Sequence, residues 1–338
     1  MMKQSYLLIF SILLLSCNSK TLVPITQVSI SELYKDSVSI RAISIDKNKL
    51  FFGTSKAYVG VLDLDTHQLD SLVVPNQAFR ATAVNSKGYY ALSINNPAQL
   101  LSLDADFNAK VVYSESGEGV FYDALHFVND EVGFGLGDNY DGCMSVLKTV
   151  DGGLSWNKIS CSELPPSELG EGAFAASNTN IESVGSNLWM ATTKGAVYRS
   201  NDLGEHWESV KSPLVDSLAT HGIYSMDFYD ELRGIIYGGD YTKPDYNKNN
   251  IAITTDGGLH WNLIADGTNL GYKSCVQFVP NSNAQQIVAV GFTGIVVSND
   301  GGLSWNTLSS ESFFTLRFID EHTAYAAGRG RIARLEFN

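Results

Sequence analysis

The sequence of 338 residues is poor in basic residues, histidine and cysteine. Lysine and arginine total 23 against 36 acidic residues, and the net charge of -13 repels a phosphate backbone, so we expect no nucleic-acid partner. The 6 histidines show no metal-ligand spacing, and CxxC, HExxH and calcium-loop patterns do not occur, so no metal site is expected. No dinucleotide fingerprint joins a strand to a helix, and we expect no cofactor.

The sequence also lacks an apolar run of membrane-spanning length. Residues 6–15 are largely apolar, but a transmembrane helix needs about 20 such residues. This run follows Lys3 and ends just before Cys17, which resembles a bacterial lipoprotein signal. We therefore expect residues 1–16 to be removed, Cys17 to carry lipid and residues 17–25 to form a tether. The predicted location is the bacterial cell envelope, with the outer membrane favoured and membrane contact through the lipid only. An ordinary secretory signal with a chance cysteine is the alternative.

What the sequence contains instead is a repeat. The pattern S/T-x-D-x-G-x-x-W occurs at 149–156, 200–207, 254–261 and 298–305, and these segments hold four of the 5 tryptophans. Each segment lies between two short apolar stretches, so we interpret it as a hairpin turn. The aspartate is expected to accept backbone N–H groups, the glycine to allow a positive φ, and the tryptophan to pack on the sheet. These residues are therefore predicted to be structural: Asp151, Trp156, Asp202, Trp207, Asp256, Trp261, Asp300 and Trp305.

The repeat predicts an all-β fold. The segments recur about every 50 residues, which is close to the length of a four-stranded propeller blade. Similar opening strands are expected at 40–43, 79–82, 122–125, 174–176, 223–226, 272–275 and 313–316. We therefore predict a seven-bladed β-propeller over residues 26–338 with Asp-box hairpins. The last blade shows only three strands, and residues 28–33 are expected to add the fourth and close the ring.

An exported chain meets an oxidising compartment, so its cysteines need partners or burial. Cys143 and Cys161 are equidistant in sequence from Gly152, the centre of the first hairpin turn. Opposite positions in an antiparallel pair make a disulfide possible, and two separately buried thiols are the alternative. Cys275 is expected to be a buried free cysteine.

The predicted strand order brings several polar residues to one mouth of the propeller channel, opposite the box hairpins. They come from the starts of first strands, from loops between second and third strands, and from residues 170–178. Such a mouth suits a polar small molecule, a glycan or a carboxylate, or an envelope protein as partner. We expect the protein to be a monomer. The alternative is that these residues are simply solvated, as channel residues often are. The candidate ligand-binding residues are Arg41, Arg80, Asp123, Asp138, Tyr140, Glu171, Tyr224, Asp240, Tyr241 and Lys273.

A catalytic alternative rests on the carboxylates in this set. Glycoside hydrolysis needs two carboxyl groups roughly 5–10 Å apart. Asp123, Glu171 and Asp240 are the candidates for such roles in a glycoside hydrolase or lyase. A scaffold that binds partners along its blade edges is a third possibility.

The box segments resemble those of Asp-box propellers, which include sialidases and photosystem II stability and assembly factors. Nearly the whole of residues 26–338 resembles a bacterial exported group labelled assembly-factor-like or oxidoreductase-like, through blocks at 121–125, 137–142, 170–178, 238–244, 271–274 and 328–332. This resemblance implies a seven-bladed propeller without an established reaction. The sialidase likeness is limited to the boxes, because no proline follows Arg41-Ala42 or Arg80-Ala81 as the sialidase opening block requires. We therefore predict binding without turnover as the leading function.

Overall fold

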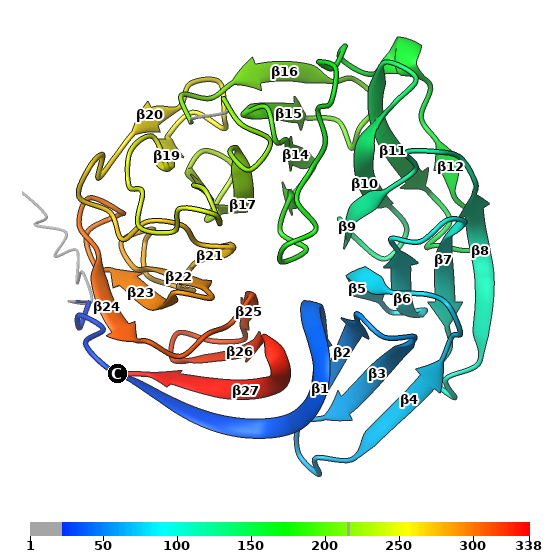
Figure 1. Ribbon diagram of the computed structural model, residues 1–338, viewed down its shortest axis with the longest axis horizontal. Coiled ribbons are helices and arrows are strands. Elements are labelled where there is room, and N and C mark those ends of the chain that lie inside the picture. Colours follow the sequence, from blue (N-terminus) through cyan, green and yellow to red (C-terminus); the bar gives the residue numbers. More distant parts are fainter. Residues whose placement is uncertain (1–21, 215–216) are drawn as a thin grey trace, which may run out of the picture.

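The computed structural model describes residues 22–214 and 217–338. The expected signal peptide (1–16) and Cys17 lie outside these residues. Regular structure in the described part is β-strand apart from one 3-10 turn, η1 (Cys161–Glu163), and the sheets are arranged in a ring (Figure 1). No helix within the described ranges is long and apolar enough to cross a membrane.

Five of the sheets have four antiparallel strands, with the first strand nearest the centre of the ring and the fourth at its outer edge (Figure 1). Their strands are β5 (Phe79–Asn85), β6 (Gly88–Ser93), β7 (Ala98–Leu103) and β8 (Ala109–Glu115); β9 (Tyr122–Phe127), β10 (Gly133–Tyr140), β11 (Cys143–Thr149) and β12 (Asn157–Lys158); β13 (Ile181–Val184), β14 (Asn187–Ala191), β15 (Ala196–Ser200) and β16 (Glu208–Lys211); β17 (Ile223–Phe228), β18 (Gly234–Gly238), β19 (Ile251–Thr254) and β20 (Asn262–Leu263); and β21 (Cys275–Phe278), β22 (Ile287–Gly291), β23 (Gly294–Ser298) and β24 (Asn306–Ser309).

The remaining sheet has seven strands and joins the two ends of the described chain. Its order is β25 (Thr315–Phe318), β26 (Thr323–Ala327), β27 (Arg329–Phe337), β1 (Val28–Asp46), β2 (Lys49–Thr54), β3 (Tyr58–Asp63) and β4 (Leu69–Val73). The first part of β1 pairs with β27, starting at Val28 opposite Phe337, and its second part pairs with β2 up to Asp46 opposite Lys49. The pairing predicted for residues 28–33 is therefore present, and it fastens the N-terminal strand to the C-terminal one.

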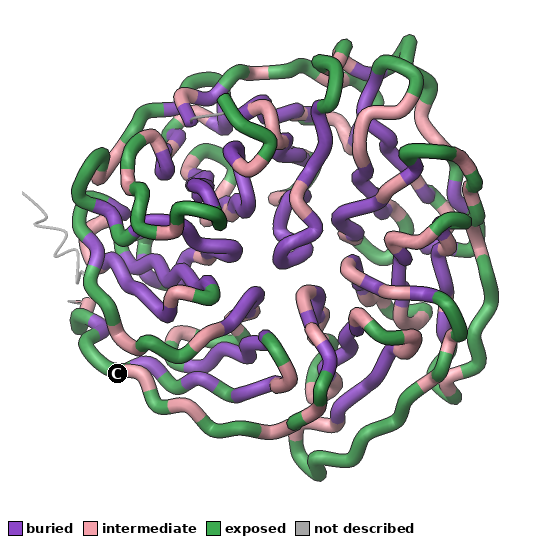
Figure 2. The backbone as a smooth tube through the Cα atoms, viewed as in Figure 1, coloured by how far each residue is buried: buried purple, intermediate pink, exposed green. Residues whose placement is uncertain are grey.

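The core lies between neighbouring sheets. Second and third strands are almost wholly buried, whereas the outer strands are exposed (Figure 2). Aromatic rings join adjacent sheets: Trp189 of β14 stacks on Phe228 of β17 with 3.6 Å between ring centroids. Burial of this kind is the main stabilising contribution in an all-β ring, because each sheet covers the apolar face of the next.

The box turns all lie on one face of the ring, which we call the hairpin face. In four sheets, a backbone N–H of the box turn donates to a carbonyl in the turn between the first and second strands. These bonds run from Gly152 to Glu131, Leu203 to Ser186, Gly257 to Leu232 and Gly301 to Gln285, at 2.8–3.1 Å. The opposite face, where the first strands begin, is called the mouth.

Within each box the serine or threonine makes the buried hydrogen bond. In the third box, Thr254 Oγ1 accepts the buried Gly258 N–H at 2.9 Å and donates to Asp256 Oδ1 at 2.8 Å. Asp256 Oδ1 also accepts the His260 N–H at 2.9 Å, near the surface. Gly258 has a φ of +85° and faces the Trp189 ring of the preceding sheet, so a side chain there would be both strained and crowded. The Thr254 hydroxyl therefore makes the buried hydrogen bond of the turn, and Asp256 links this hydroxyl to the backbone near the surface.

The structure contains a disulfide between Cys143, at the start of β11, and Cys161 in η1, with the two Cα atoms 5.5 Å apart. Cys275 on β21 is a buried free thiol. Of the two alternatives left open by the sequence, the bridge is the one present.

One strand prediction is wrong. Residues 174–176 do not open an inner strand, because β13 begins only at Ile181. The preceding residues 173–180, here called the plug segment, instead extend into the centre of the ring (Figures 1 and 2).

The plug segment bonds with inner strands of several sheets. Asn178 accepts the Leu125 N–H at 2.9 Å and donates to the Thr82 carbonyl at 2.8 Å. The Thr315 hydroxyl donates to the Ser177 carbonyl at 2.9 Å. These bonds satisfy the Asn178 side-chain amide and the Ser177 carbonyl without strand pairing. The segment therefore remains a loop.

Candidate functional site at the mouth

A cavity of about 270 Å³, here called the mouth cavity, lies above the plug segment. The plug supplies its floor through Phe174, Ala175 and Ala176. A separate cavity of about 300 Å³ is lined by Asn178 of the plug and by residues farther along the inner strands, such as His126. The plug segment therefore contributes to the lining of both cavities. The lining of the mouth cavity consists of Arg41, Arg80, Phe174, Ala175, Ala176, Tyr224, Tyr241, Tyr272, Phe292 and Phe314.

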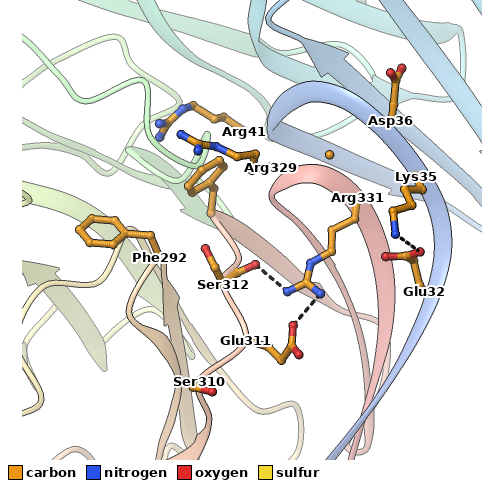
Figure 3. A pocket seen from close by; sticks show the side chains of 12 residues that line it. Glu32, Lys35, Asp36, Arg41, Phe292, Ser310, Glu311, Ser312, Arg329 and Arg331 are labelled. Atoms are coloured by element: carbon orange, nitrogen blue, oxygen red, sulfur yellow. Dashed lines mark hydrogen bonds and ion pairs between the residues drawn. The ribbon is translucent and has the colours of Figure 1, made fainter.

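A larger depression of about 850 Å³, the rim cavity, adjoins it and shares Arg41, Phe292 and Phe314. Figure 3 shows the guanidinium groups of Arg41 and Arg329 side by side in this depression. Arg331 lies deeper and is bound by its neighbours: it is 2.7 Å from Glu311 and donates to the Ser312 carbonyl at 2.9 Å. The two cavities together form one concave basin at the mouth.

Within the described residues, three arginines in this basin form no direct ion pair, although burial lowers the pKa of Arg80 and the nearby buried Asp123 carboxylate opposes this shift. Among residues 22–214 and 217–338, no carboxylate forms an ion pair with Arg41, Arg80 or Arg329. Burial, followed by the charge of Arg80, lowers the pKa of Arg41, and Arg329 adds to this effect. A guanidinium stays protonated despite such a shift. The rim cavity is also lined by Glu32, Asp36 and Glu311, of which Glu32 pairs with Lys35 and Glu311 with Arg331. The positive charge open to an anionic ligand is therefore that of Arg41, Arg80 and Arg329.

Aromatic rings form the other side of the mouth cavity. Phe174 stacks on Tyr224 with 3.7 Å between centroids, and Tyr272 meets Tyr224 edge-on at 4.8 Å. The Arg41 guanidinium lies 4.2 Å from the centroid of Phe314. Tyr241 and Phe292 remain exposed and are free to contact a ligand. Such a wall suits apolar or planar parts of a ligand, and the arginines suit its acidic groups.

Two of the predicted carboxylates lie beneath the basin. Asp123 on β9 is fully buried, and neither of its carboxyl oxygens has a hydrogen-bond partner among the described atoms. Its burial, with the Asp138 carboxylate nearby, raises the pKa of Asp123 well above its usual value. Asp138 accepts the Ala173 N–H at 3.1 Å and lies so close to Gly172 that a Cβ there would be 2.0 Å from Asp138 Oδ1. Asp138 therefore holds the first residue of the plug segment.

Four other predicted residues line neither cavity and make contacts within the protein, although Glu171 Oε1 is buried without a hydrogen-bond partner in the described chain. Glu171 accepts the Glu168 N–H at 2.7 Å, and Asp240 accepts the Thr242 N–H at 2.9 Å and lies 3.2 Å from His221 Nε2. The buried Lys273 ammonium donates to the Leu270 and Tyr272 carbonyls and to Thr293. Tyr140 lies under the Lys158 ammonium, 4.8 Å from its ring centroid.

This placement bears on the catalytic alternative. No carboxylate is among the residues that line the mouth cavity in the described chain, and Asp123, Glu171 and Asp240 are all buried. Glycoside hydrolysis requires two carboxyl groups that reach the same bond of the sugar. Asp123, Glu171 and Asp240 therefore do not form such a pair at the mouth cavity, and the carboxylates that line the adjoining rim cavity are Glu32, Asp36 and Glu311. The described residues also contain no group of three potential metal ligands.

The basin includes Arg41, Arg80, Tyr224 and Tyr241 from the predicted set, together with residues that the sequence reasoning missed. Phe314 was detectable, because it occupies the same position in its opening block as Arg41, Arg80 and Tyr224. Arg329 stands in a Gly-Arg-Gly-Arg block that was noted only for its resemblance. Phe174 and Tyr272 are the first residues of two predicted opening blocks, whereas the candidates from such blocks stand at second positions, and Phe292 gave no signal.

Comparisons with known proteins give the fold class. No family model matches the chain, and no curated protein matches it. The structure of YCF48 bound to D1 peptide superposes with a TM-score of 0.64 at 12% identity, over 93% of this chain and 98% of that one. YCF48 from Cyanidioschyzon merolae gives 0.62 at 12% identity, over 91% and 98%. The WD40 repeats of RRP9 give 0.65 at 12% identity, over 93% and 100%.

The chain folds as a β-propeller. At this level of identity the likeness concerns the fold alone, because propellers with the same architecture serve unrelated functions.

Proposed function

We propose that this protein is an exported, lipid-anchored propeller that binds carboxylate groups of a partner protein at its mouth, without turnover. The single observation that carries the proposal is the basin, in which Arg41, Arg80 and Arg329 lie beside an aromatic wall without an ion pair to a carboxylate of the described chain. Arginine pairs well with carboxylates, because its planar fork donates two parallel hydrogen bonds.

The architecture supports a binding role. We count seven blades, because β1 serves both as the outer strand beside β27 and as the inner strand beside β2. The four box segments place the Asp-box hairpins on the face opposite the basin. A structural neighbour, YCF48, is known bound to D1 peptide, which supports a protein segment as the ligand class in preference to a sugar. Lipidation of Cys17 would keep such a receptor in the bacterial envelope, with the outer membrane as the proposed location.

The ligand class is testable with fluorescent polyglutamate as a carboxylate-bearing peptide and polygalacturonate as an acidic glycan. Arg41→Gln, Arg80→Gln and Arg329→Gln should each weaken polyglutamate binding about tenfold or more, since a hydrogen bond to a charged group is worth about 1.5–3 kcal/mol. Arg334→Gln is the matched control, because Arg334 is exposed on β27 and pairs with Glu336 at 3.0 Å.

Unchanged binding in all three basin variants, or an equal loss in the Arg334 control, would contradict the site. Binding of polygalacturonate but not of polyglutamate would contradict the protein partner and support a glycan instead. Mass spectrometry of the mature protein tests the anchor separately: an unacylated Cys17 would remove it.

A further inference from the structure

The start of the described chain is fastened to the hairpin face. The Asn299 side chain, within the fourth box, accepts the Ile25 N–H at 2.9 Å and donates to the Ile25 carbonyl at 3.0 Å. Gln286 donates to the Val23 carbonyl at 2.7 Å, and Ile25 is buried. Figure 1 shows this first stretch beside β24 at the edge of the ring. The direction in which the chain leaves the propeller is therefore fixed by specific contacts.

The proposed anchor is close to this point. Residues 18–21 separate Cys17 from Leu22, and this length of chain spans at most about 20 Å. The mouth lies on the other side of the ring, beyond inner strands such as β5 that are about 20 Å long. A lipid at Cys17 therefore reaches a membrane beside the hairpin face or the adjoining edge, but not one placed against the mouth.

The hairpin face also exposes large apolar side chains at its tips. Leu154, Leu259 and Leu303 follow the second glycine of three box turns and are 65%, 46% and 61% exposed. Leu232 and Ile319, in turns between first and second strands of the same face, are 58% and 47% exposed. Leu303 is in the same turn as Asn299, and so lies nearest the anchor.

The charges on this face limit which lipids suit it. Each box turn carries an aspartate, and Asp230, Glu231 and Asp320 stand in the neighbouring turns. Two cations of this face are paired, Arg233 with Asp230 at 2.7 Å and Lys87 with Glu131 at 3.0 Å, so they do not offset the box-turn aspartates. Because these acidic groups would be repelled by anionic headgroups within a Debye length of about 10 Å, the apolar tips are suited to a neutral, zwitterionic surface.

We infer that the hairpin face is the membrane-docking face: the box-turn leucines contact a zwitterionic lipid surface, and the mouth points away from it. This inference rests on the proposed lipid anchor. It assigns the exposed leucines a role in orienting the propeller, while the acyl chains of Cys17 supply the membrane affinity.

The experiment uses the full mature lipidated protein in phosphatidylcholine vesicles that contain a nitroxide-labelled quencher lipid. A fluorophore is attached through Leu303→Cys on the hairpin face or through Leu169→Cys as the control. Leu169 is 98% exposed and belongs to the loop whose Glu168 carbonyl bonds to Asn139 near the mouth. The native thiols do not interfere, because Cys275 is buried and Cys143 is bridged to Cys161.

Quenching should be several-fold stronger at position 303 than at 169, and replacing half of the lipid by phosphatidylglycerol should reduce it at 303. Equal quenching at both positions, stronger quenching at 169, or an increase with phosphatidylglycerol would overturn the inference. Acylation of Cys17 is checked by mass spectrometry on the same sample. An unacylated protein contradicts the anchor, whereas an acylated protein without quenching at 303 contradicts only the docking face.

Discussion

The box turns allow a sharp test of which side chain stabilises a propeller hairpin. In the third box, Thr254 is 1% exposed, and its hydroxyl is the acceptor for the buried Gly258 N–H. Thr254→Val keeps the shape but leaves that N–H without an acceptor and removes the donor to Asp256. An unsatisfied buried donor costs about 1–3 kcal/mol, and we expect a loss of unfolding free energy in this range.

Two further substitutions in the same box provide comparisons for the loss expected in Thr254→Val. Asp256→Ala should cost less, about 1 kcal/mol, because the exposed His260 N–H can bind solvent, and the buried Thr254 hydroxyl loses its acceptor but still accepts the Gly258 N–H. Thr254→Ser should cost no more than about 0.8 kcal/mol, the value of one buried methyl group. Serine already fills this position in the second and fourth boxes, where Ser200 and Ser298 accept the equivalent glycine N–H at 2.9 and 2.8 Å.

The assay is guanidinium-induced unfolding followed by tryptophan fluorescence. The denaturation midpoints are compared among variants whose free energy of unfolding depends equally on guanidinium concentration. The expected order of destabilisation is Thr254→Val, then Asp256→Ala and Thr254→Ser. If Asp256→Ala lowers the free energy of unfolding more than Thr254→Val does, the reasoning is refuted, and the aspartate is the main stabilising side chain of the turn. Polyglutamate binding by the folded fraction should be unchanged in all three variants, because the box lies on the face opposite the basin.

Three further outcomes are expected. Trp261→Ala should cost about 3–5 kcal/mol and the half-buried Trp207→Ala less, as measured by the same unfolding assay. Joint replacement of Cys143 and Cys161 by serine should lower the free energy of unfolding by up to about 3 kcal/mol, the entropy of a loop of this size, which a urea titration would show. The pKa of Asp123 is raised in the folded state, so the stability it contributes is present at low pH and is lost as the pH rises above its unfolded value of about 3.9. Melting temperatures of Asp123→Asn should therefore fall less steeply with pH than those of the wild type.

The strands were largely predictable because each repeat carries its own signals. A box fixes the third and fourth strands on either side of it, and the apolar opening block fixes the first, as at β17, which begins at the expected Ile223. The fourth blade broke this rule. Its block at 174–176 has the right composition, but its position is decided by distant partners such as Thr82 and Thr315. A sequence pattern indicates the local preference for a strand, but it does not reveal hydrogen bonds between residues that are far apart in the sequence.

The candidate site was less predictable, since position in a repeat does not decide where a side chain points. Lys273 shares its repeat position with Arg41, yet its ammonium turns inward to two carbonyls and Thr293, and burial lowers its pKa to about 8. Arg41 at the same position rests on Phe314 and faces the basin. The two short blocks do not distinguish these outcomes, because the Lys273 ammonium is held by the bend of its own backbone at Leu270 and Tyr272 and by Thr293 of a later loop.

The separation of charge across the ring connects the two proposals. The protein has a net charge of -13, yet its unpaired arginines gather at the mouth while aspartates occupy every box turn of the opposite face. Such a distribution attracts an anionic partner to the mouth and repels it from the hairpin face, and it does so before contact is made. With the hairpin face against a membrane, the attracting side is the one open to the partner. The plug segment lines the floor of the mouth cavity, so a ligand bound there contacts the plug as well as the arginines. Added salt should therefore slow association at the mouth more than it speeds dissociation, since it screens the approach and leaves the desolvated arginine contacts largely intact.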